Sequence, residues 1–447
     1  MSMNSHSRSR RIGTVDVTPK KSLGQNFLVD VGLSRWITDQ VQPEGAPVVV
    51  EIGPGLGALT EHLVGRPQEL ILIEKDTRLA ASLMERFSAD GKVSVRNEDA
   101  SDMDLRSLYR YGEVRVVGNL PYSMGGEILK RVLTAPSPVT CAVFMLQKEV
   151  CNRLCARQVD DAYGGLSLLV QKDWDVELLR IVPPEVFNPR PKVDSAIVRF
   201  TPKPPGSLPV FDRALFDRLV RAGFSQRRKQ MKNLMPEPPG GWLAMVESLG
   251  VSPTVRAEEL SLEQWVAVAR WYEQRTEKDR GQRASELFDV VNERNEVIEQ
   301  KPRGQVHAEG LMHRAVHVFV LNKLGQIYLQ KRSHLKDVHP LTWDSSASGH
   351  LDVGESYSAC ALREVREELG IEVAGTEKVA EIPATERTGM EFVELHRAEH
   401  GGPMKFAPDE IAIGEWFSPE QISQWSVERP QDFATGFLEC WKVWQSR

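Results

Sequence analysis

A glycine-rich turn in the first part of the chain has the composition of a ligand-binding site. The segment 48–63 (VVVEIGPGLGALTEHL) combines an apolar strand, a turn and the start of a helix. Gly53, Gly55 and Gly57 allow the backbone to turn tightly and to approach a ligand closely. Their spacing, E-x-G-x-G-x-G, differs from the G-x-G-x-x-G of dinucleotide-binding turns. A glycine-rich turn alone is weak evidence, so the residues that follow it decide which ligand is expected.

Two carboxylates follow this turn at the ends of the next two predicted strands. Glu74 closes the strand ELILIE, where it can accept hydrogen bonds from ribose hydroxyl groups. Asp99 closes a third strand, in RNEDA, where it can accept a hydrogen bond from an adenine amino group. A glycine turn with Glu and Asp at successive strand ends fits S-adenosylmethionine. The alternative is a structural turn beside exposed acids.

The segment NLPY, residues 119–122, follows another predicted strand and offers what an amino-group methyltransferase needs. The exocyclic amine of adenine is a poor nucleophile, because its lone pair is delocalised into the ring. The side-chain oxygen of Asn119 and the backbone carbonyl of Leu120 or Pro121 can accept the two amine hydrogens and favour a pyramidal nitrogen. Pro121 fixes the turn, and Tyr122 offers a ring face on which a base can stack. We therefore expect positioning and electrostatics to carry the rate, without a general base.

A second chemical site is predicted in the last third of the chain, where three carboxylates share one face of a helix. Glu364, Glu367 and Glu368 follow the i, i+3, i+4 spacing of helical neighbours, and Ser356 can cap the helix. The face assigned to the core carries Leu362, Val365 and Leu369. Clustered carboxylates repel each other unless a cation lies among them, and hard oxygen ligands select Mg²⁺ or Mn²⁺, which would bridge a diphosphate. The alternative is a solvated acidic face.

The elements that must position these groups form α/β patterns in two parts of the chain. Short β-branched runs alternate with helical patterns, which predicts a doubly wound, Rossmann-like sheet in the first block and a second α/β domain in the last. Between them, a proline-rich break and a polar segment flank an all-helical block. The predicted organisation is a disordered tail at 1–11, an α/β domain at 12–205, a helical domain at 206–273, a linker at 274–286 and a second α/β domain at 287–447.

Charge is distributed unevenly along the chain. The net formal charge is −6, of which residues 1–280 carry +3 and the remainder −9, so the two parts are expected to meet different partners. The basic excess is concentrated in RAGFSQRRKQMK, residues 221–232, a segment that can contact the phosphates of RNA. The residues predicted to make these contacts are Arg221, Arg227, Arg228, Lys229 and Lys232. A solvated helix face is the alternative.

The bulk composition excludes several classes of protein. The 447 residues are 41% hydrophobic and 26% charged, as in a globular protein of two or three domains. No apolar run approaches the roughly 20 residues of a membrane span, and the N-terminus lacks the apolar core of a signal peptide. Five cysteines without a CxxC pair argue against disulfides and against a zinc site. We therefore expect a cytoplasmic protein without a membrane partner.

At these residues the chain resembles the KsgA-type small-subunit rRNA adenine dimethyltransferases. The resemblance covers about residues 12–272 and rests on KKSLGQNFLVD, EIGPGLGALT, IEKD, NEDA, NLPYSMGGEIL, VFNPRPKVDSAIVRF and FSQRRKQMKNLM, in this order. It implies N6-dimethylation of two adjacent adenines near the 3′ end of 16S rRNA, with the small ribosomal subunit as partner. The implied S-adenosylmethionine site contains Asn26, Leu28, Gly53, Gly55, Glu74, Asp99 and Asn119. The implied catalytic residues are Asn119, Pro121, Tyr122 and Phe187, the last as a second aromatic ring beside the target base.

Two other interpretations of the first half stay open. Related enzymes that methylate large-subunit rRNA share the catalytic motifs, whereas the helical block with FSQRRKQMKNL favours the small subunit. The second is a non-catalytic role in ribosome assembly, against which the intact set of Asn119, Pro121 and Tyr122 argues.

The carboxylate helix matches the Nudix signature G-x5-E-x7-R-E-U-x-E-E-x-G-U, in which U is aliphatic. The matching residues are Gly349, Glu355, Arg363, Glu364, Val365, Glu367, Glu368, Gly370 and Ile371. The resemblance covers about residues 285–447 and implies a Nudix α/β/α sandwich that directs water onto a phosphoanhydride. It assigns metal binding to Glu364, Glu367 and Glu368, and catalysis to Glu367 and Glu368. Arg363 would orient the glutamates by pairing with Glu355.

Flanking segments resemble the isopentenyl-diphosphate-isomerase-like group of Nudix proteins: ELFDVVNERNEVI, HAEGLMHRAVHVFV, LQKRS and HPLTWDSSASGH. The isomerases use a cysteine just before the equivalent of SGH, whereas residues 344–350 contain none. Because serine is a poor replacement for a thiol in that protonation, we expect a hydrolase of a nucleoside-diphosphate-type or other diphosphate substrate, with an isomerase as the alternative. His313, His317, His339 and His350 are candidates for binding metal or phosphate, and equally for being packed or surface histidines.

Overall fold

The computed structural model describes residues 11–12, 15–16, 25–122, 124–226, 228–274 and 285–447. The chain divides into two compact units: unit 1 comprises residues 1–204, 217–237 and 242–265, and unit 2 comprises 205–216, 238–241 and 266–447. The predicted helical block at 206–273 thus contributes residues to both units, and the predicted domain boundaries stay a prediction. Of the predicted tail only Arg11 is described, and most of the predicted linker lies outside the described residues. No described helix is both long and apolar enough to cross a membrane.

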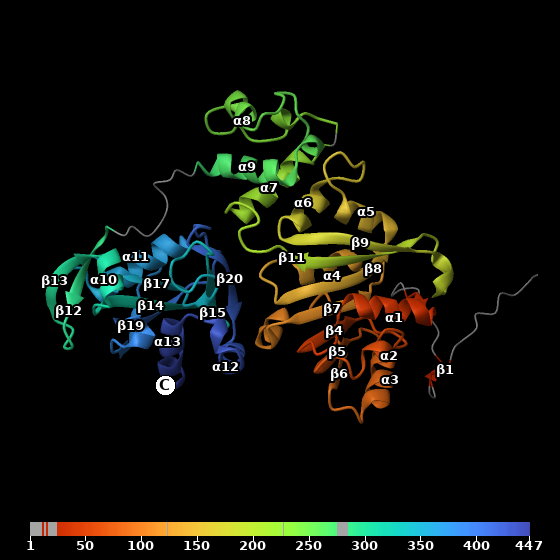
Figure 1. Ribbon diagram of the computed structural model, residues 1–447, viewed down its shortest axis with the longest axis horizontal. Helices are drawn as coiled ribbons and strands as arrows, with labels where there is room; N and C mark the ends of the chain where they lie inside the picture. Colours follow the sequence, from red (N-terminus) through yellow and green to blue (C-terminus); the bar gives the residue numbers. More distant parts are fainter. Residues whose placement is uncertain (1–10, 13–14, 17–24, 123, 227, 275–284) are drawn as a thin grey trace, which may run out of the picture. The chain divides into compact units, whose positions relative to one another are not determined.

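Unit 1 contains the predicted doubly wound sheet (Figure 1). Its seven strands lie in the order β6 (Val93–Arg96), β5 (Glu69–Ile73), β4 (Val48–Ile52), β7 (Val114–Asn119), β8 (Val139–Gln147), β11 (Ser195–Pro202) and β9 (Trp174–Val182). The first five are parallel, and β11 runs antiparallel to both β8 and β9. Because the carboxyl ends of parallel strands meet at one edge, the segments after β4, β5, β6 and β7 converge there.

Apolar residues on both faces of this sheet explain its three layers. Along β4, Val48, Val50 and Ile52 belong to one buried cluster, while Val49 belongs to another, as expected from the alternation of side chains along a strand. The covering elements are α1 (Val31–Gln40), α2 (Thr60–Leu63), α3 (Thr77–Phe87), η2 (Leu105–Tyr111), α4 (Gly125–Leu133), α5 (Lys148–Cys155) and α6 (Gly165–Gln171). Short strands β1 (Arg11–Ile12) and β2 (Val15–Asp16) pair with each other, and β3 (Phe27–Leu28) pairs with β10 (Phe187–Asn188), which follows η3 (Pro184–Val186).

The outer strand β9 is largely solvated. Its apolar residues Leu178 and Ile181 are exposed, whereas Trp174 and Val182 at its two ends are buried.

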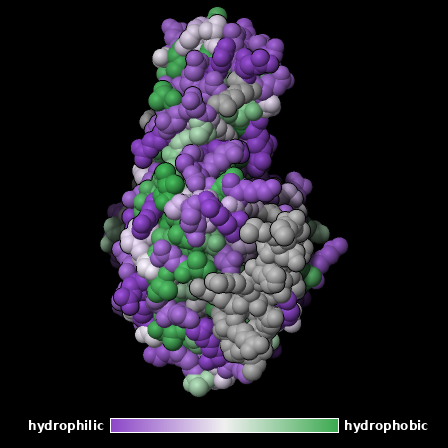
Figure 2. Space-filling view, turned by 90° about the vertical axis from the view of Figure 1, so that its right-hand side faces the viewer, coloured by the Kyte–Doolittle hydropathy of each residue, from purple (hydrophilic) through white to green (hydrophobic). Residues whose placement is uncertain are grey.

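On the face shown in Figure 2, hydrophobic groups are interspersed among hydrophilic ones. This mixture is ordinary for a folded protein surface and identifies no binding site.

The block that follows is helical, as predicted. It contains α7 (Arg213–Gly223), η4 (Met231–Asn233), α8 (Trp242–Ser248), η5 (Ala257–Glu259) and α9 (Leu262–Glu273). Trp265 is fully buried and stacks on Phe224 with ring centroids 5.8 Å apart. A side chain at Gly223 would meet the ring of Trp265 at 2.5 Å, so the close approach of these segments requires glycine there.

Unit 2 is an α/β/α sandwich around a mixed sheet, as predicted. The sheet order is β16 (Trp343–Asp344), β15 (Ile327–Arg332), β14 (His313–Leu321), β19 (Glu391–Glu399) and β18 (Glu377–Ile382), with β17 (Ala347–His350) also paired to β14 and β20 (Ile411–Phe417) to β15. A hairpin of β12 (Leu287–Val291) and β13 (Val297–Pro302) precedes α10 (Arg303–Glu309). The other helices are α11 (Tyr357–Leu369), η7 (Glu386–Thr388), α12 (Pro419–Glu428), η8 (Pro430–Asp432) and α13 (Thr435–Gln445). Apolar residues of α11 pack on Val316 and Val318, while Phe437 of α13 packs on Phe319, so the two helices cover opposite faces (Figure 1).

Helix α11 begins where the sequence predicted. Ser356 caps it by accepting a hydrogen bond from the amide of Ala359 at 3.3 Å. Val365 and Leu369 are buried, but the assignment of Leu362 to the core was wrong, because this side chain is 40% exposed. Ala361 occupies the core position instead, and this shifts the apolar stripe by one residue.

Candidate functional sites

The carboxyl edge of the parallel strands in unit 1 holds a cavity of about 290 Å³. Its lining includes every residue expected to bind S-adenosylmethionine: Asn26, Leu28, Gly53, Gly55, Glu74, Asp99 and Asn119. Pro121 and Tyr122 line it as well. Phe187 does not: it is 5% exposed, pairs with Leu28 across β10 and β3, and lies in the buried cluster on one face of the sheet.

Glu74 connects the glycine turn to the next strand. Its carboxylate accepts hydrogen bonds from the amides of Gly55 (3.0 Å) and Asp76 (2.8 Å). The side chain is buried, and this burial raises its pKa above the ordinary value. A carboxylate has further lone pairs beyond the two used here, so Glu74 can both hold the turn and accept from a ligand.

Asp99 is held from two sides at the cavity rim. Lys75 forms an ion pair with Oδ2, and Oδ1 accepts from the amide (3.1 Å) and the hydroxyl (2.8 Å) of Ser101. Burial alone would raise the pKa of Asp99, but the hydrogen bonds from Lys75 and Ser101 outweigh it and lower the pKa. Asp99 therefore remains a hydrogen-bond acceptor at neutral pH.

The structure of the NLPY turn distinguishes between the backbone carbonyls of Leu120 and Pro121, which the sequence left as alternative acceptors. The oxygen of Pro121 accepts from the amides of Met124 (3.0 Å) and Gly125 (2.9 Å) at the start of α4. The side-chain amide of Asn119 donates to the backbone oxygen of Asn26 at 3.0 Å, which leaves its Oδ1 as the acceptor. Among the described residues, none donates to the carbonyl of Leu120. The free pair of acceptors is therefore Asn119 Oδ1 and Leu120 O.

Glu51 is a residue of this cavity that sequence reasoning missed. It lies in the all-buried strand β4, is 1% exposed, and accepts a hydrogen bond from the Thr60 hydroxyl at 2.7 Å. Burial raises the pKa of Glu51 to about 8, so the carboxyl is protonated at neutral pH. The signal in the sequence was one acid inside an otherwise apolar strand.

The basic segment of the helical block is at the surface. Arg221, Arg228, Lys229 and Lys232 are exposed, as contact with RNA phosphates would require, and Arg227 lies outside the described residues.

In unit 2, Arg363 gathers the acidic residues of the Nudix segment, as expected. Its guanidinium donates to both oxygens of Glu355 (3.0 and 2.8 Å), to Glu364 (2.7 Å) and, more weakly, to Glu367 (3.3 Å). It also donates to the backbone oxygen of His350 at 3.0 Å, which fixes the helix to β17. The planar Arg363 guanidinium, with its several N–H donors, therefore holds these carboxylates close together.

The three predicted metal ligands differ in burial. Glu364 and Glu368 flank the core stripe of α11, where Glu364 is buried and Glu368 is half-buried, whereas the Glu367 side chain is 56% exposed. Burial raises the pKa of Glu364 to about 8 and also raises that of Glu368, which accepts from Ser348 N (2.9 Å) and Gln330 Nε2 (3.1 Å). Carboxylates with raised pKa values are stabilised as anions by a bound cation, so these oxygens fit Mg²⁺ or Mn²⁺.

These glutamates line a cavity of about 440 Å³ that also contains cationic groups. Arg332 pairs with Asp344 at 3.0 Å, Lys336 pairs with Glu410, and Arg303 lines the same cavity. Burial lowers the pKa of Lys336 and of Arg303. Carboxylates and cations around one cavity suit a polyanionic ligand that is bound together with a metal ion.

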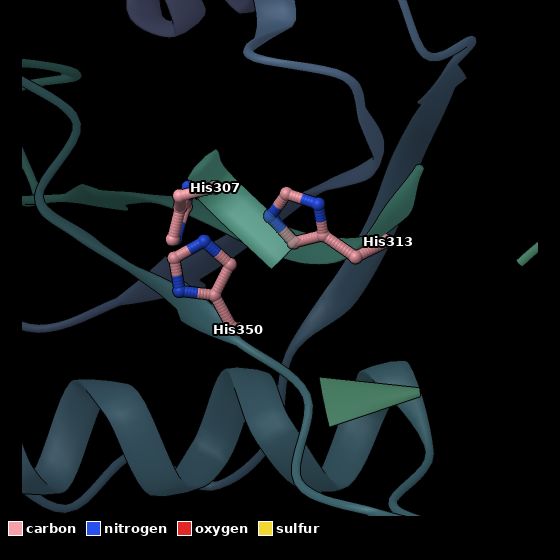
Figure 3. Close-up of side chains that lie close together, drawn as sticks. All are labelled: His307, His313 and His350. Atoms are coloured by element: carbon pink, nitrogen blue, oxygen red, sulfur yellow. The ribbon is translucent and has the colours of Figure 1, made fainter. Parts of the chain in front are cut away.

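A cluster of three histidines lies at this cavity, and two of them, His307 and His350, line it (Figure 3). Ligand nitrogens of His307, His313 and His350 lie within 4.8 Å of one another, and His350 Nε2 is 3.0 Å from Glu391. The Nδ1 atom of His313 is 2.9 Å from the carbonyl of Leu311 and must donate to it, while the buried Nε2 lies 3.6 Å from Glu391 Oε1, beyond hydrogen-bond distance. Histidine nitrogens with a nearby carboxylate are a donor set for a divalent cation.

Two of the histidines predicted as candidates, His317 and His339, lie outside this cluster. His317 and His339 line the cavity but contact Ser345 (2.6 Å) and Thr435 (3.1 Å) instead of the cluster. His307 was missed by sequence reasoning, because it lies on α10 outside the Nudix signature.

The sheet topology and the cavity at the strand ends define unit 1 as a Rossmann-like methyltransferase domain, and the carboxylate helix on a mixed sheet defines a Nudix domain in unit 2. The ribosomal RNA adenine dimethylase family matches residues 17–274, and the NUDIX domain family matches residues 311–435. The chain belongs to the ribosomal RNA adenine dimethylase family and carries a NUDIX domain after it.

Several known proteins match more than half of the chain. A protein named ribosomal RNA small subunit methyltransferase A from Thiobacillus denitrificans is 39% identical over 57% of this chain and 98% of its own length. A protein of the same name from Proteus mirabilis is 38% identical over 56% of this chain and 93% of its own length. A crystal structure of the 23S rRNA methyltransferase ErmE is 25% identical over 56% of this chain and all of that chain, with a TM-score of 0.46.

Proposed function

We propose that the chain dimethylates N6 of two adjacent adenines near the 3′ end of 16S rRNA, with S-adenosylmethionine as methyl donor. One observation carries this proposal: a single cavity joins the residues expected to bind the donor to the free acceptors Asn119 Oδ1 and Leu120 O. Two relatives, which match this chain over 98% and 93% of their own length, are named for the small ribosomal subunit.

In this mechanism the protein positions the amine and assists its attack. Asn119 and the Leu120 carbonyl accept the two amine hydrogens, which frees the nitrogen lone pair to point at the methyl group. Tyr122 stacks the base, and Glu74 and Asp99 hold the ribose and adenine of the donor. S-adenosylmethionine would supply the electrophilic methyl group: in each of the two transfers the N–C bond forms as the sulfonium S–C bond breaks, the thioether product leaves, and the amine loses one proton to solvent. Phe187 is proposed as a second stacking ring, which requires it to leave its buried position.

Two alternatives to this proposal are methylation of a large-subunit rRNA and a purely structural role in ribosome assembly. The test is label transfer from S-adenosylmethionine to isolated small and large subunits that lack adenine dimethylation. Label in the small subunit supports the proposal, label in the large subunit alone moves the activity to the other substrate, and no label in either leaves the assembly role. The exposed cations Arg228, Lys229 and Lys232 are proposed to hold the rRNA.

For unit 2 we propose metal-dependent hydrolysis of a diphosphate substrate. Glu364, Glu367 and Glu368 would hold Mg²⁺ or Mn²⁺, which activates water and neutralises phosphate charge. Glu367 and Glu368 are also proposed to assist catalysis. Arg363 orients these carboxylates, and Arg303, Arg332 and Lys336 face the phosphates.

The structure argues against an isomerase at this site. Ala347 occupies the position just before SGH where the isomerases use a cysteine, no cysteine is among the described residues that line the cavity, and the nearby Cys360 is buried with its pKa raised by that burial. Hydrolysis is tested by adding diphosphates of different classes with Mg²⁺ to the full chain. Glu368→Gln should abolish phosphate release and leave methylation intact, whereas equal release by the variant contradicts the proposal.

We also propose that the histidine cluster holds a divalent cation. The close spacing of the three histidine nitrogens, with Glu391 Oε1 3.0 Å from His350 Nε2 and 3.6 Å from His313 Nε2, supports this assignment. Calorimetric titration of the full chain with Mn²⁺ should lose one binding event in His313→Ala and retain it in His396→Ala, a control at another buried histidine. Equal titrations of wild type and His313→Ala contradict the assignment.

We place the protein in the cytoplasm, where ribosomal subunits occur and where its five free cysteines remain reduced.

A further inference from the structure

The stacking residue Tyr122 is anchored at its far end by a serine from another strand. Its phenol oxygen lies 2.6 Å from Oγ of Ser195, a residue 73 positions later in the chain. Tyr122 lines the donor cavity, whereas Ser195 is fully buried. The hydrogen bond therefore connects the wall of the cavity to the interior of the sheet.

Ser195 is a rigid point of attachment. It opens β11 and pairs with Gln147 of β8 on one side and with Val182 of β9 on the other. A residue with strand partners on both sides cannot shift without breaking ladder hydrogen bonds. Among the described residues, Tyr122 is the hydrogen-bond partner of the Ser195 hydroxyl.

The near end of Tyr122 is fixed by the NLPY turn. The Pro121 ring restricts the backbone, and the Pro121 carbonyl accepts from Met124 and Gly125. A tyrosine whose backbone is fixed still has two side-chain torsions, and the bond at its hydroxyl restrains both. Burial raises the pKa of Tyr122 above its ordinary value, so the hydroxyl keeps its proton and can take part in this bond at neutral pH.

We propose that Ser195 is a positioning residue for methyl transfer: it fixes the ring of Tyr122 so that the stacked adenine presents its amine to Asn119 and Leu120. This inference rests on the proposed methyltransferase function. The serine touches neither substrate nor donor, and its effect passes through the orientation of one ring. Small misplacements of a reacting group cost large factors in rate, so a single buried hydrogen bond is enough to matter.

A double-mutant cycle on single-turnover methylation of small subunits tests the proposal. Ser195→Ala and Tyr122→Phe each remove one side of the hydrogen bond, and each should lower the rate about 10-fold at saturating donor and subunit. The double variant should lose no more than either single variant. The dissociation constant for S-adenosylmethionine should stay within about 2-fold of wild type, because the bond does not touch the donor.

Ser167→Ala is the matched control, because Ser167 is equally buried and its hydroxyl donates to the Arg153 carbonyl at 2.6 Å outside the cavity lining. It should methylate at the wild-type rate. Single-variant losses that multiply in the double variant overturn the proposal, as does a wild-type rate in Tyr122→Phe, which keeps the ring and is decisive even if Ser195→Ala fails to fold. Absence of methylation by the wild-type protein refutes the proposed function itself and is distinguishable from both results.

Discussion

Replacing Glu51 by glutamine should change how the stability of unit 1 depends on pH. The Glu51 carboxyl is 1% exposed, and its burial raises the pKa from an ordinary value of 4.5 to about 8. Between these two pH values the unfolded chain ionises at this residue while the folded protein keeps the proton. Glutamine resembles the protonated carboxyl in shape and can still accept the hydrogen bond from Thr60, but it does not titrate.

The sign and the size of the effect follow from proton linkage. Because folding raises the pKa of Glu51, the contribution of this residue to the free energy of unfolding is fully present below pH 4.5 and is lost as the pH rises towards 8. A shift of about 3.5 units corresponds to at most about 5 kcal/mol of unfolding free energy. The stability of Glu51→Gln relative to wild type should therefore rise by several kcal/mol between pH 5 and pH 8.

Hydrogen exchange of peptides covering β4 measures this opening free energy in unit 1 alone. It would be recorded at pH 5, 6, 7 and 8 for wild type, for Glu51→Gln and for Glu61→Gln, whose side chain is 54% exposed on the neighbouring helix α2. The Glu61 variant should follow wild type in its pH dependence. Parallel curves for wild type and Glu51→Gln would show that the buried carboxyl is not protonated on folding, and the reasoning would be refuted.

Three further outcomes are expected. Asn119→Ala should reduce single-turnover methylation about 100-fold to 1,000-fold with little change in donor affinity, because it removes one amine acceptor; an unchanged rate would exclude that role. Gly349→Ala should reduce diphosphate hydrolysis about 100-fold, since its new Cβ would lie 2.0 Å from Oε1 of Glu364, while methylation serves as the internal control. The double charge reversal of Arg228 and Lys229 to Glu should weaken binding to small subunits and flatten its dependence on salt concentration, measured by filter binding from 50 to 200 mM salt; an unchanged slope would contradict phosphate contact.

Many of the residues that line the two candidate sites could be predicted from the sequence, because they lie in local patterns. Gly53, Glu74 and Asp99 each follow a parallel strand, and such strands bring their carboxyl ends to one edge of a sheet. The spacing of Glu364 and Glu368 likewise fixes one helical face without knowledge of the remaining fold.

The remaining residues of the two candidate sites could not be predicted, because their roles depend on contacts between segments that are distant in the sequence. Glu51 appears as one acid in an apolar strand, and only the packing of the sheet shows that it is wholly buried. His307 reaches His313 and His350 from a helix outside the signature, and no spacing rule links them. Ser195 is equally invisible from sequence, because its partner lies 73 residues away and their contact depends on the order of strands.

The proposed methylation of small-subunit rRNA by unit 1 can be tested directly. The most direct measurement supplies labelled S-adenosylmethionine to small subunits lacking adenine dimethylation and maps the label along the rRNA, for wild type and for Asn119→Ala. We predict label on two adjacent adenines near the 3′ end for the wild type, and almost none for the variant. Label at other positions, or equal labelling by Asn119→Ala, would contradict it.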